Sequence, residues 1–385
     1  MPEEVSSVNP SILRWARECL GLSVDDVAAK LGRDTDEVEA WERGSSAPTY
    51  AQLEKLAYSI YKRPLAVFFL PEKPKEPSVR KEFRTLPEFD LDHLQADTRY
   101  QIRIAKAFQV SLKELNSGVN AIKEPIFREI SLSKNKELDR QANRVRKNLR
   151  VSLSAQQSWP DERQAFKEWR NAIEDRGIYV FKQSFKQKEI SGFCLPDLEF
   201  PIIYLNNSTT QTRQIFSLFH ELGHLLLDVR GISKFDPAYI NDLPPAERET
   251  EQFCNAFAAE VLMPSADFDA QIRDVDQFEE KAVVRLAKRY HVSREAVLRR
   301  LLDKELVDQD FYETKAKEWR EQIAVGSGGN YYANQATYLG EKYVNLVLGK
   351  HYEGKLSLEQ AADHLGLKTA NVAGLEAMAL RKVSE

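Results

Sequence analysis

Residues 213–229 read RQIFSLFHELGHLLLDV, an apolar stretch that carries two histidines and a glutamate near its middle. Hydrophobic residues continue around most of the helical circumference, so we expect a helix that is buried on most sides. Unpaired polar groups are costly in that setting, and His220, Glu221 and His224 therefore need compensating partners. His220 and His224 are four residues apart, which places both imidazole rings on one helix face, where they can bind a single metal ion.

These residues form the pattern H-E-x-x-H, in which the two histidines bind zinc and the glutamate between them acts as general base. The sequence thus predicts His220 and His224 as metal ligands and Glu221 as the catalytic residue. The competing interpretation is a pair of core histidines satisfied by their neighbours, with Glu221 in a buried ion pair. A short sheet expected just before this helix and an acidic helix just after it favour the metal site.

Tetrahedral zinc needs a further protein ligand. The longer pattern with a third histidine fails, because Leu227 stands at its glycine position and Arg230 at its histidine position. A carboxylate on the following helix, within residues 244–264, is therefore expected. We choose Glu251, since small residues follow it at helical spacing and allow a close approach to the histidine helix. The other carboxylates available on this segment are Glu247, Glu249 and Glu260. Zn²⁺ is the expected ion, although such a ligand set also accepts Mn²⁺ or another divalent metal.

Composition describes an ordinary folded chain, with 385 residues, 42% hydrophobic residues and a formal charge of −4. Its length favours two or three domains. The three cysteines form no disulfide framework or cysteine zinc site, which favours the reducing cytoplasm. A secretory leader and membrane-length apolar runs are not evident, so we expect no membrane role. The charge gives no global basic field for nucleic acid.

The expected fold is mainly α with a small β-sheet (α+β). Three short segments rich in β-branched and aromatic residues, at 177–181, 190–195 and 200–206, predict the strands, and most of the remaining chain predicts helices. The expected domains are an all-helical helix-turn-helix domain (10–70), a proline-rich linker (71–79), a zincin-like metalloprotease domain with helical flanks (80–325) and a helical C-terminal region (326–385). The glycine-rich segment VGSGGN (325–330) marks the second break, and we find no periodic repeat.

The helix-turn-helix prediction rests on local signals near the N-terminus. Ser23 and Asp26 form a capping box that opens one helix, Gly32 closes it, and the helix TDEVEAWERG ends at Gly44. We expect Arg33, Trp41 and Arg43 to contact DNA or a protein partner.

The negative charge of this second helix disfavours DNA binding. From residue 33 to residue 43 there are two cations and five anions, giving 2 − 5 = −3, and phosphates would repel such a helix. Docking of a protein or dimerisation is therefore an equal alternative for this fold. A separate basic cluster at residues 140–150 is interpreted as a solvated helix face, because acidic residues lie among its cations.

The chain resembles the ImmA/IrrE-type zinc metallo-endopeptidases, in particular longer members fused to an N-terminal Xre-type helix-turn-helix domain. The resemblance extends from about residue 10 to the tail. It rests on FPIIYLN (200–206), RQIFSLFHELGHLLL (213–227), ETEQFCNAFAAEVLMP (249–264), AWERGSSAPTYAQLEKLA (40–57) and PLAVFFLP (64–71). It implies zinc held by His220, His224 and Glu251, with Glu221 as general base. Cys254 and Phe219 depart from the usual residues but are not ligands.

Two functions from different classes follow from the resemblance. The first is a cytoplasmic endopeptidase that cleaves a repressor or another cognate regulatory protein in a stress response. Some longer members of the family are encoded beside a toxin, so a toxin is also an expected partner. The alternative is a DNA-binding transcriptional regulator or antitoxin whose zincin domain serves for recognition. A helical interaction protein without metal is the third interpretation. For the protease, we expect the edge of PIIYLN (201–206) to hold the substrate and Tyr204 or Tyr239 to stabilise the oxyanion.

Overall fold

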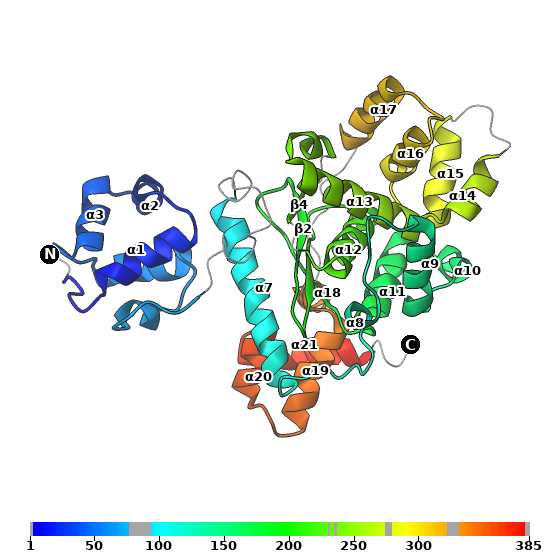
Figure 1. The fold of residues 1–385 in the computed structure, drawn as a ribbon. Coiled ribbons are helices and arrows are strands. Elements are labelled where there is room, and N and C mark those ends of the chain that lie inside the picture. Colours follow the sequence, from blue (N-terminus) through cyan, green and yellow to red (C-terminus); the bar gives the residue numbers. More distant parts are fainter. Residues whose placement is uncertain are drawn as a thin grey trace. The chain divides into compact units, whose positions relative to one another are not determined.

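The computed structural model describes residues 3–76, 94–229, 232–234, 237–273, 279–321 and 331–381 (Figure 1). Two compact units make up the chain: Met1–Ile104 with Phe185–Gln187, and Ala105–Ser184 with Lys188–Glu385. Helices dominate and one four-stranded sheet accompanies them, which confirms the predicted α+β class. The break predicted at 325–330 and the end of the predicted linker at 71–79 lie outside the described residues. Within the described ranges, no helix combines the length and apolar character needed to cross a membrane.

In the first unit, two consecutive helices joined by a short turn have termini that follow the sequence signals. Ser23 accepts a hydrogen bond from the Asp26 backbone, and the Asp26 carboxylate accepts one from the Ser23 backbone, so the capping box is confirmed. Gly32 and Gly44 end the two helices in the left-handed conformation that glycine adopts without a steric penalty. The elements of this unit are α1 (Pro10–Cys19), α2 (Val24–Leu31), α3 (Thr35–Arg43), α4 (Tyr50–Glu54), a π-helical turn (Lys55–Ile60) and η2 (Leu65–Phe69).

Trp41 lies in the core of this unit. Its side chain is 3% exposed and packs with residues of α1, α2 and the turns after α4. A buried indole cannot reach a partner, so the expected contact role of Trp41 is not compatible with this structure. The apolar ring faces inward because α3 is one-sided, and the charged residues occupy its outer face.

The second unit contains the sheet, built of β1 (Tyr179–Gln183), β2 (Ile190–Leu195), β3 (Ile202–Asn206) and β4 (Ile232–Lys234), in the order β1-β3-β2-β4. The three predicted strands are confirmed, whereas β4 was not predicted. β3 pairs with β1 in parallel and with β2 antiparallel, so both of its edges are occupied. The expectation that PIIYLN offers a free edge to substrate is therefore wrong. β4 pairs only with β2 among the described residues, and it forms the edge of the sheet.

Helices surround this sheet in the second unit. They are α7 (Ala96–Leu115, shared with the first unit), α8 (Ile126–Glu129), α9 (Leu138–Leu149), α10 (Leu153–Ser158), α11 (Glu162–Glu174), α12 (Gln211–Leu226), η3 (Pro237–Asp242), α13 (Pro245–Leu262), α14 (Ser265–Ile272), α15 (Glu280–Tyr290), α16 (Arg294–Asp303), α17 (Gln309–Glu321), α18 (Tyr331–Leu339), α19 (Glu341–Tyr352), α20 (Leu358–Leu365), η4 (Thr369–Asn371) and α21 (Val372–Arg381). α12 packs against β2, β3, α11 and α13, which makes it the central helix of the unit.

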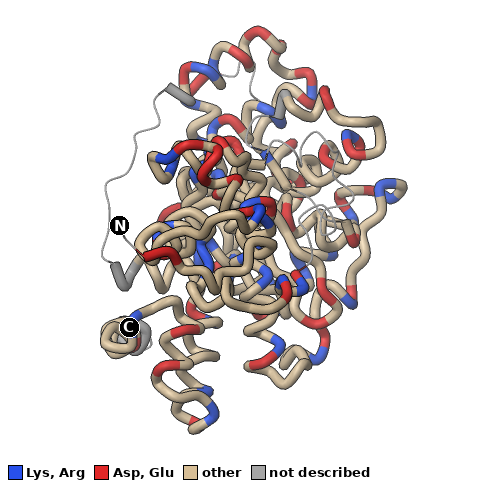
Figure 2. The backbone as a smooth tube through the Cα atoms, turned by 90° about the vertical axis from the view of Figure 1, so that its left-hand side faces the viewer, with Lys and Arg blue, Asp and Glu red and all other residues tan. Residues whose placement is uncertain are grey.

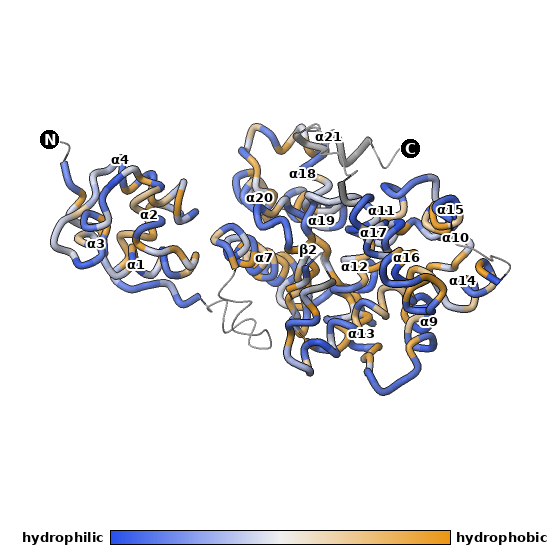
Figure 3. Tube along the Cα trace, turned by 90° about the horizontal axis from the view of Figure 1, so that it is seen from above, coloured by the Kyte–Doolittle hydropathy of each residue, from blue (hydrophilic) through white to orange (hydrophobic). Residues whose placement is uncertain are grey.

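The core around α12 explains why this helix is apolar on nearly every side. Phe219 makes an edge-to-face contact with Trp169 of α11 at a centroid distance of 4.7 Å. Hydrophobic stretches gather near β2 and α12 (Figure 3). Arg146, which we had expected on a solvated face, is instead buried and donates to the Val261 carbonyl and to Gln156. Arg146 thus gives a hydrogen-bond partner to a carbonyl group in the last turn of the helix Pro245–Leu262. The charge pattern of α9 did not predict this contact.

Candidate metal centre

Two adjacent helices bring the predicted metal ligands together. α12 carries His220, Glu221 and His224, and α13 carries Glu251. The helices approach closely at Gly223, where an added Cβ would lie 3.1 Å from Phe257 and 3.3 Å from the Cys254 sulfur. A side chain at position 223 would therefore force the helices apart and separate the histidines from Glu251.

The donor atoms of this cluster converge on one point. His220 Nε2 lies 3.2 Å from Glu251 Oε2, and His224 Nε2 lies 3.1 Å from Glu251 Oε1. The two Nε2 atoms are 3.0 Å apart. Donors that each sit about 2.0–2.1 Å from a tetrahedral ion are separated by roughly 3.3 Å, close to these three distances. All three side chains are buried, so the cluster is shielded from bulk water.

Asn255 fixes which nitrogen of His220 faces the cluster. Its Oδ1 lies 2.8 Å from His220 Nδ1, and an amide oxygen can only accept, so the ring proton is on Nδ1. The lone pair on Nε2 is then directed at Glu251 and His224. Electron-rich atoms this close together require a cation or protons between them, and the donor set of two imidazoles and a carboxylate suits a divalent metal such as Zn²⁺.

The close approach of these side chains also shifts the pKa values of His220 and Glu251. Burial alone would lower the pKa of His220, but the hydrogen bond and charge of Glu251 outweigh it and raise that pKa above its usual value. Burial alone would raise the pKa of Glu251, yet the two histidines hold it well below its usual range. Each shift expresses the attraction between an anionic carboxylate and positive charge on the imidazoles, and this is the charge that a metal ion supplies when it binds.

Glu221 lies beside the cluster without joining it. Its Oε1 accepts a hydrogen bond of 2.5 Å from the Ser233 hydroxyl of β4, and its Oε2 is buried without a protein partner in the described structure. Burial raises the pKa of the Glu221 carboxyl, an effect that the nearby His224 and His220 oppose. A carboxylate with an unused, buried oxygen next to a metal site is suited to take a proton from a water molecule.

The two tyrosines proposed for the oxyanion occupy different places. Tyr239, in η3, donates a 2.5 Å hydrogen bond to Glu251 Oε2, and burial raises its pKa well above the usual value. Tyr204 is only 1% exposed, stacks on Phe193 within the sheet and does not line the cleft described next. The structure therefore brings Tyr239 to the site and leaves Tyr204 in the core.

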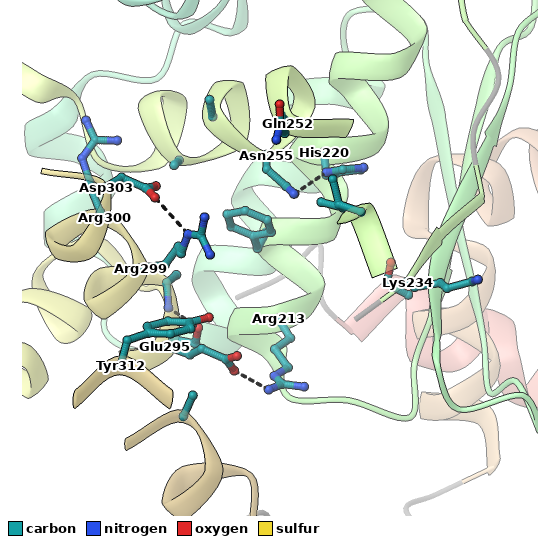
Figure 4. A pocket seen from close by; sticks show the side chains of 18 of the residues that line it. Arg213, His220, Lys234, Gln252, Asn255, Glu295, Arg299, Arg300, Asp303 and Tyr312 are labelled. Carbon is teal, nitrogen blue, oxygen red and sulfur yellow. Dashed lines mark hydrogen bonds and ion pairs between the residues drawn. The ribbon is translucent and has the colours of Figure 1, made fainter. Parts of the chain in front are cut away.

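A cleft of about 850 Å³ opens from His220 toward α16 and α17. His220, Ser233 and Tyr239 line its inner end, whereas Glu221, His224 and Glu251 are buried behind them. Figure 4 shows the His220–Asn255 pair at this end and, further along, the ion pairs Arg213–Glu295 and Arg299–Asp303. The wall of the cleft formed by α16 and α17 carries charged side chains of both signs.

The remaining predicted residues lie elsewhere. Glu260 pairs with Arg300 at 2.6 Å, and Glu249 is largely exposed beside Lys134, so both carboxylates are engaged away from the histidines. In the first unit, the side chains of Arg33, in the turn before α3, and Arg43, at the end of α3, are 51% and 56% exposed and pair with Glu37 and Glu39 of α3. The contacts of Ser233 and Tyr239 had no sequence signal, whereas Asn255 stands one helical turn after Glu251.

Comparison with protein families supports a metallopeptidase. Residues 173–302, about a third of the chain, match the model of the Peptidase_M78 family, described as the IrrE N-terminal-like domain. This match contains the whole sheet, α12 and α13, and hence all the residues of the cluster. A search of curated proteins gave no match. The segment 173–302 is therefore similar to the IrrE N-terminal-like domain, a similarity that points to a metallopeptidase of the ImmA/IrrE type.

Proposed function

We propose that His220, His224 and Glu251 bind a divalent metal, with Zn²⁺ first and Mn²⁺ as the alternative, and that the chain is an endopeptidase acting on a specific regulatory protein. The observation that carries this proposal is the convergence of both Nε2 atoms on one carboxylate, with Glu221 on the same helix beside them. Two imidazoles, a carboxylate and an adjacent general base form the residue set of a gluzincin-type peptidase.

Each protein group then has a defined task. A metal held by this cluster supplies Lewis-acid activation of water and of a carbonyl group. Glu221 accepts the proton of the attacking water on its free Oε2 and returns it to the leaving amine. Ser233 holds the other oxygen of Glu221 and so orients the carboxylate. Tyr239, whose hydroxyl donates to Glu251 in this structure, would redirect that hydrogen bond to the developing oxyanion.

The substrate would bind as an added strand on β4. This strand is the edge of the sheet in the described structure, and both Ser233 and Lys234 line the cleft. Backbone hydrogen bonds to an edge strand hold a peptide extended without requiring a particular sequence. Side chains along α16 and α17, including Arg299 and Asp303, would then contribute the selectivity for one protein.

Burial of the site favours activity that depends on a partner or a signal. Glu221 is 0% exposed. The Ser233 hydroxyl donates a hydrogen bond to Glu221, and the Tyr239 hydroxyl donates one to Glu251. We infer that the N-terminal helix-turn-helix recognises DNA or a protein partner, and that the substrate is a repressor-like protein. The same burial supports the alternative of a DNA-binding regulator or antitoxin that uses this domain for recognition. The three free cysteines suit a reducing cytoplasm.

A comparison of the protein N-termini present in host cells distinguishes the protease from the regulator or antitoxin. Cells expressing the wild-type chain would be compared with cells expressing Glu221→Gln, with and without stress. The proposal expects termini that arise only with the wild type, because Glu221→Gln removes the base and keeps the three ligands. Matching profiles under every condition, with equal metal content, would favour the regulator or antitoxin.

A further inference from the structure

The helix-turn-helix of the first unit has a second copy at the C-terminus. Residues 22–42 read LSVDDVAAKLGRDTDEVEAWE, and residues 356–376 read LSLEQAADHLGLKTANVAGLE. Aligned without gaps, eight of these 21 positions are identical: Leu, Ser, Ala, Leu, Gly, Thr, Val and Glu. We expected no periodic repeat, and a search for a fixed period misses this pair because the two copies lie at opposite ends of the chain.

The two copies share the contacts that shape the motif. Ser357 and Gln360 form a capping box at the start of α20, as Ser23 and Asp26 do at the start of α2. Gly366 ends α20 at φ 61°, and Gly32 ends α2 at φ 70°. The same two local devices therefore set the start of the first helix and the turn in each copy.

The packing of the second helix is also repeated. Val372 and Leu375 are buried, as are Val38 and Trp41 at the aligned positions. The aligned glutamates each contact the first helix of their copy, although the contacts differ in kind: Glu42 forms an ion pair with Arg17 of α1, and Glu376 accepts from the Tyr352 hydroxyl of α19. We call α19–α21 (residues 341–381) the C-terminal helix-turn-helix.

The copies differ in the charge of the helix that follows the turn. Four acidic residues of the N-terminal copy are replaced by neutral or basic residues in the C-terminal copy: Asp34 by Lys368, Asp36 by Ala370, Glu37 by Asn371 and Glu39 by Ala373. These positions thus change from −4 to +1. Lys368, Thr369, Ala370 and Ala373 are exposed, and no acidic residue lies between Gly366 and Leu375. Elsewhere, acidic and basic residues are interspersed along the backbone (Figure 2).

We propose that the C-terminal helix-turn-helix binds duplex DNA, with the start of η4 and α21 in the major groove. The second helix of this motif enters the groove through its N-terminal residues, and a negative charge there is repelled by phosphates. Lys368 can contact a phosphate, the Thr369 hydroxyl can bond a base edge, and Ala370 and Ala373 allow close approach. In the N-terminal copy, the acidic residues at the aligned positions would be repelled by the DNA phosphates. This proposal is independent of the metallopeptidase site.

Binding is tested on the full chain with a random pool of duplex DNA, followed by titration of the selected sequence by fluorescence anisotropy at two salt concentrations. The variant Lys368→Asp/Ala373→Glu returns two positions to the acidic character of the N-terminal copy. The matched control Lys30→Asp/Ala29→Glu makes the same two changes at exposed positions of α2. Unfolding temperatures of both variants should equal that of the wild type.

We expect the C-terminal variant to bind the selected duplex at least tenfold more weakly, with a smaller salt dependence, and the control to bind within twofold of the wild type. Failure of the wild type to enrich any duplex sequence would overturn the proposal. Equal losses in the two variants would do the same, because net charge alone would then explain the binding.

Discussion

Replacing Asn255 by alanine tests whether the contact with His220 organises a metal site. Asn255 Oδ1 lies 2.8 Å from His220 Nδ1, and the side chain of His220 is 5% exposed. Without Asn255 the buried ring N–H loses its partner, at a cost of about 1–3 kcal/mol. The imidazole is then no longer held in the tautomer and orientation that aim Nε2 at Glu251. We expect the affinity for Zn²⁺ to fall about 10- to 100-fold, the usual effect of removing an outer-shell partner.

The assay is a competition titration of Zn²⁺ against a chromophoric chelator at neutral pH, which gives the dissociation constant directly. Gln252→Ala is the matched control, because Gln252 lies on the same helix and lines the same cleft. The control should bind Zn²⁺ like the wild type. If Asn255→Ala also binds like the wild type, or if both variants are weakened equally, the assignment of Asn255 as the partner that orients a ligand is refuted.

Three further predictions concern other contacts of the second unit. Burial lowers the pKa of Lys182 to about 7 in the folded protein. Between pH 7 and the higher pKa of an exposed lysine, the unfolded chain therefore binds more protons than the folded one. The free energy of unfolding of the wild type should rise with pH in this range, by up to about 1.4 kcal/mol per pH unit. Lys182→Met should remove that rise and stabilise the fold at pH 7 by roughly 1–3 kcal/mol, as measured by urea denaturation at several pH values. Arg300→Met leaves the buried Glu260 carboxylate without its cationic partner, with only hydrogen bonds from Ser265, and should cost about 3–5 kcal/mol in thermal unfolding, with part of the loss restored by adding Glu260→Gln; an unchanged unfolding temperature would contradict this. Tyr239→Phe should retain the metal while lowering kcat for peptide cleavage about 100-fold, and an unchanged kcat would exclude Tyr239 as the oxyanion donor.

Local and periodic features of the fold were predictable from the sequence. Capping residues fix where a helix begins, so Ser23 and Gly32 mark the ends of α2 without knowledge of the tertiary structure. The i, i+4 spacing of His220 and His224 places both rings on one face of any helix. Glu251 followed from the small residues after it, because a close helix approach leaves few other carboxylates within reach.

Features that depend on tertiary contacts were not predictable. β4 is only three residues long, too short for a period of two to be recognised, and strand order decides that β3 is internal. Trp41 was predicted as a contact residue because it resembles the Xre pattern in a charged helix, yet the packing of the first unit places it in the core. Tyr239 comes to Glu251 through a short 3₁₀ turn that no sequence pattern had marked. Each of these outcomes is set by which elements pack together.

The metal content of purified variants shows directly whether His220, His224 and Glu251 form a metal site. Purified wild type, Glu221→Gln and Glu251→Ala would be loaded with Zn²⁺, desalted and measured by inductively coupled plasma mass spectrometry. We expect one zinc per chain in the wild type and in Glu221→Gln, and a near-complete loss in Glu251→Ala. Stoichiometric zinc in Glu251→Ala, or none in the wild type, would contradict this assignment.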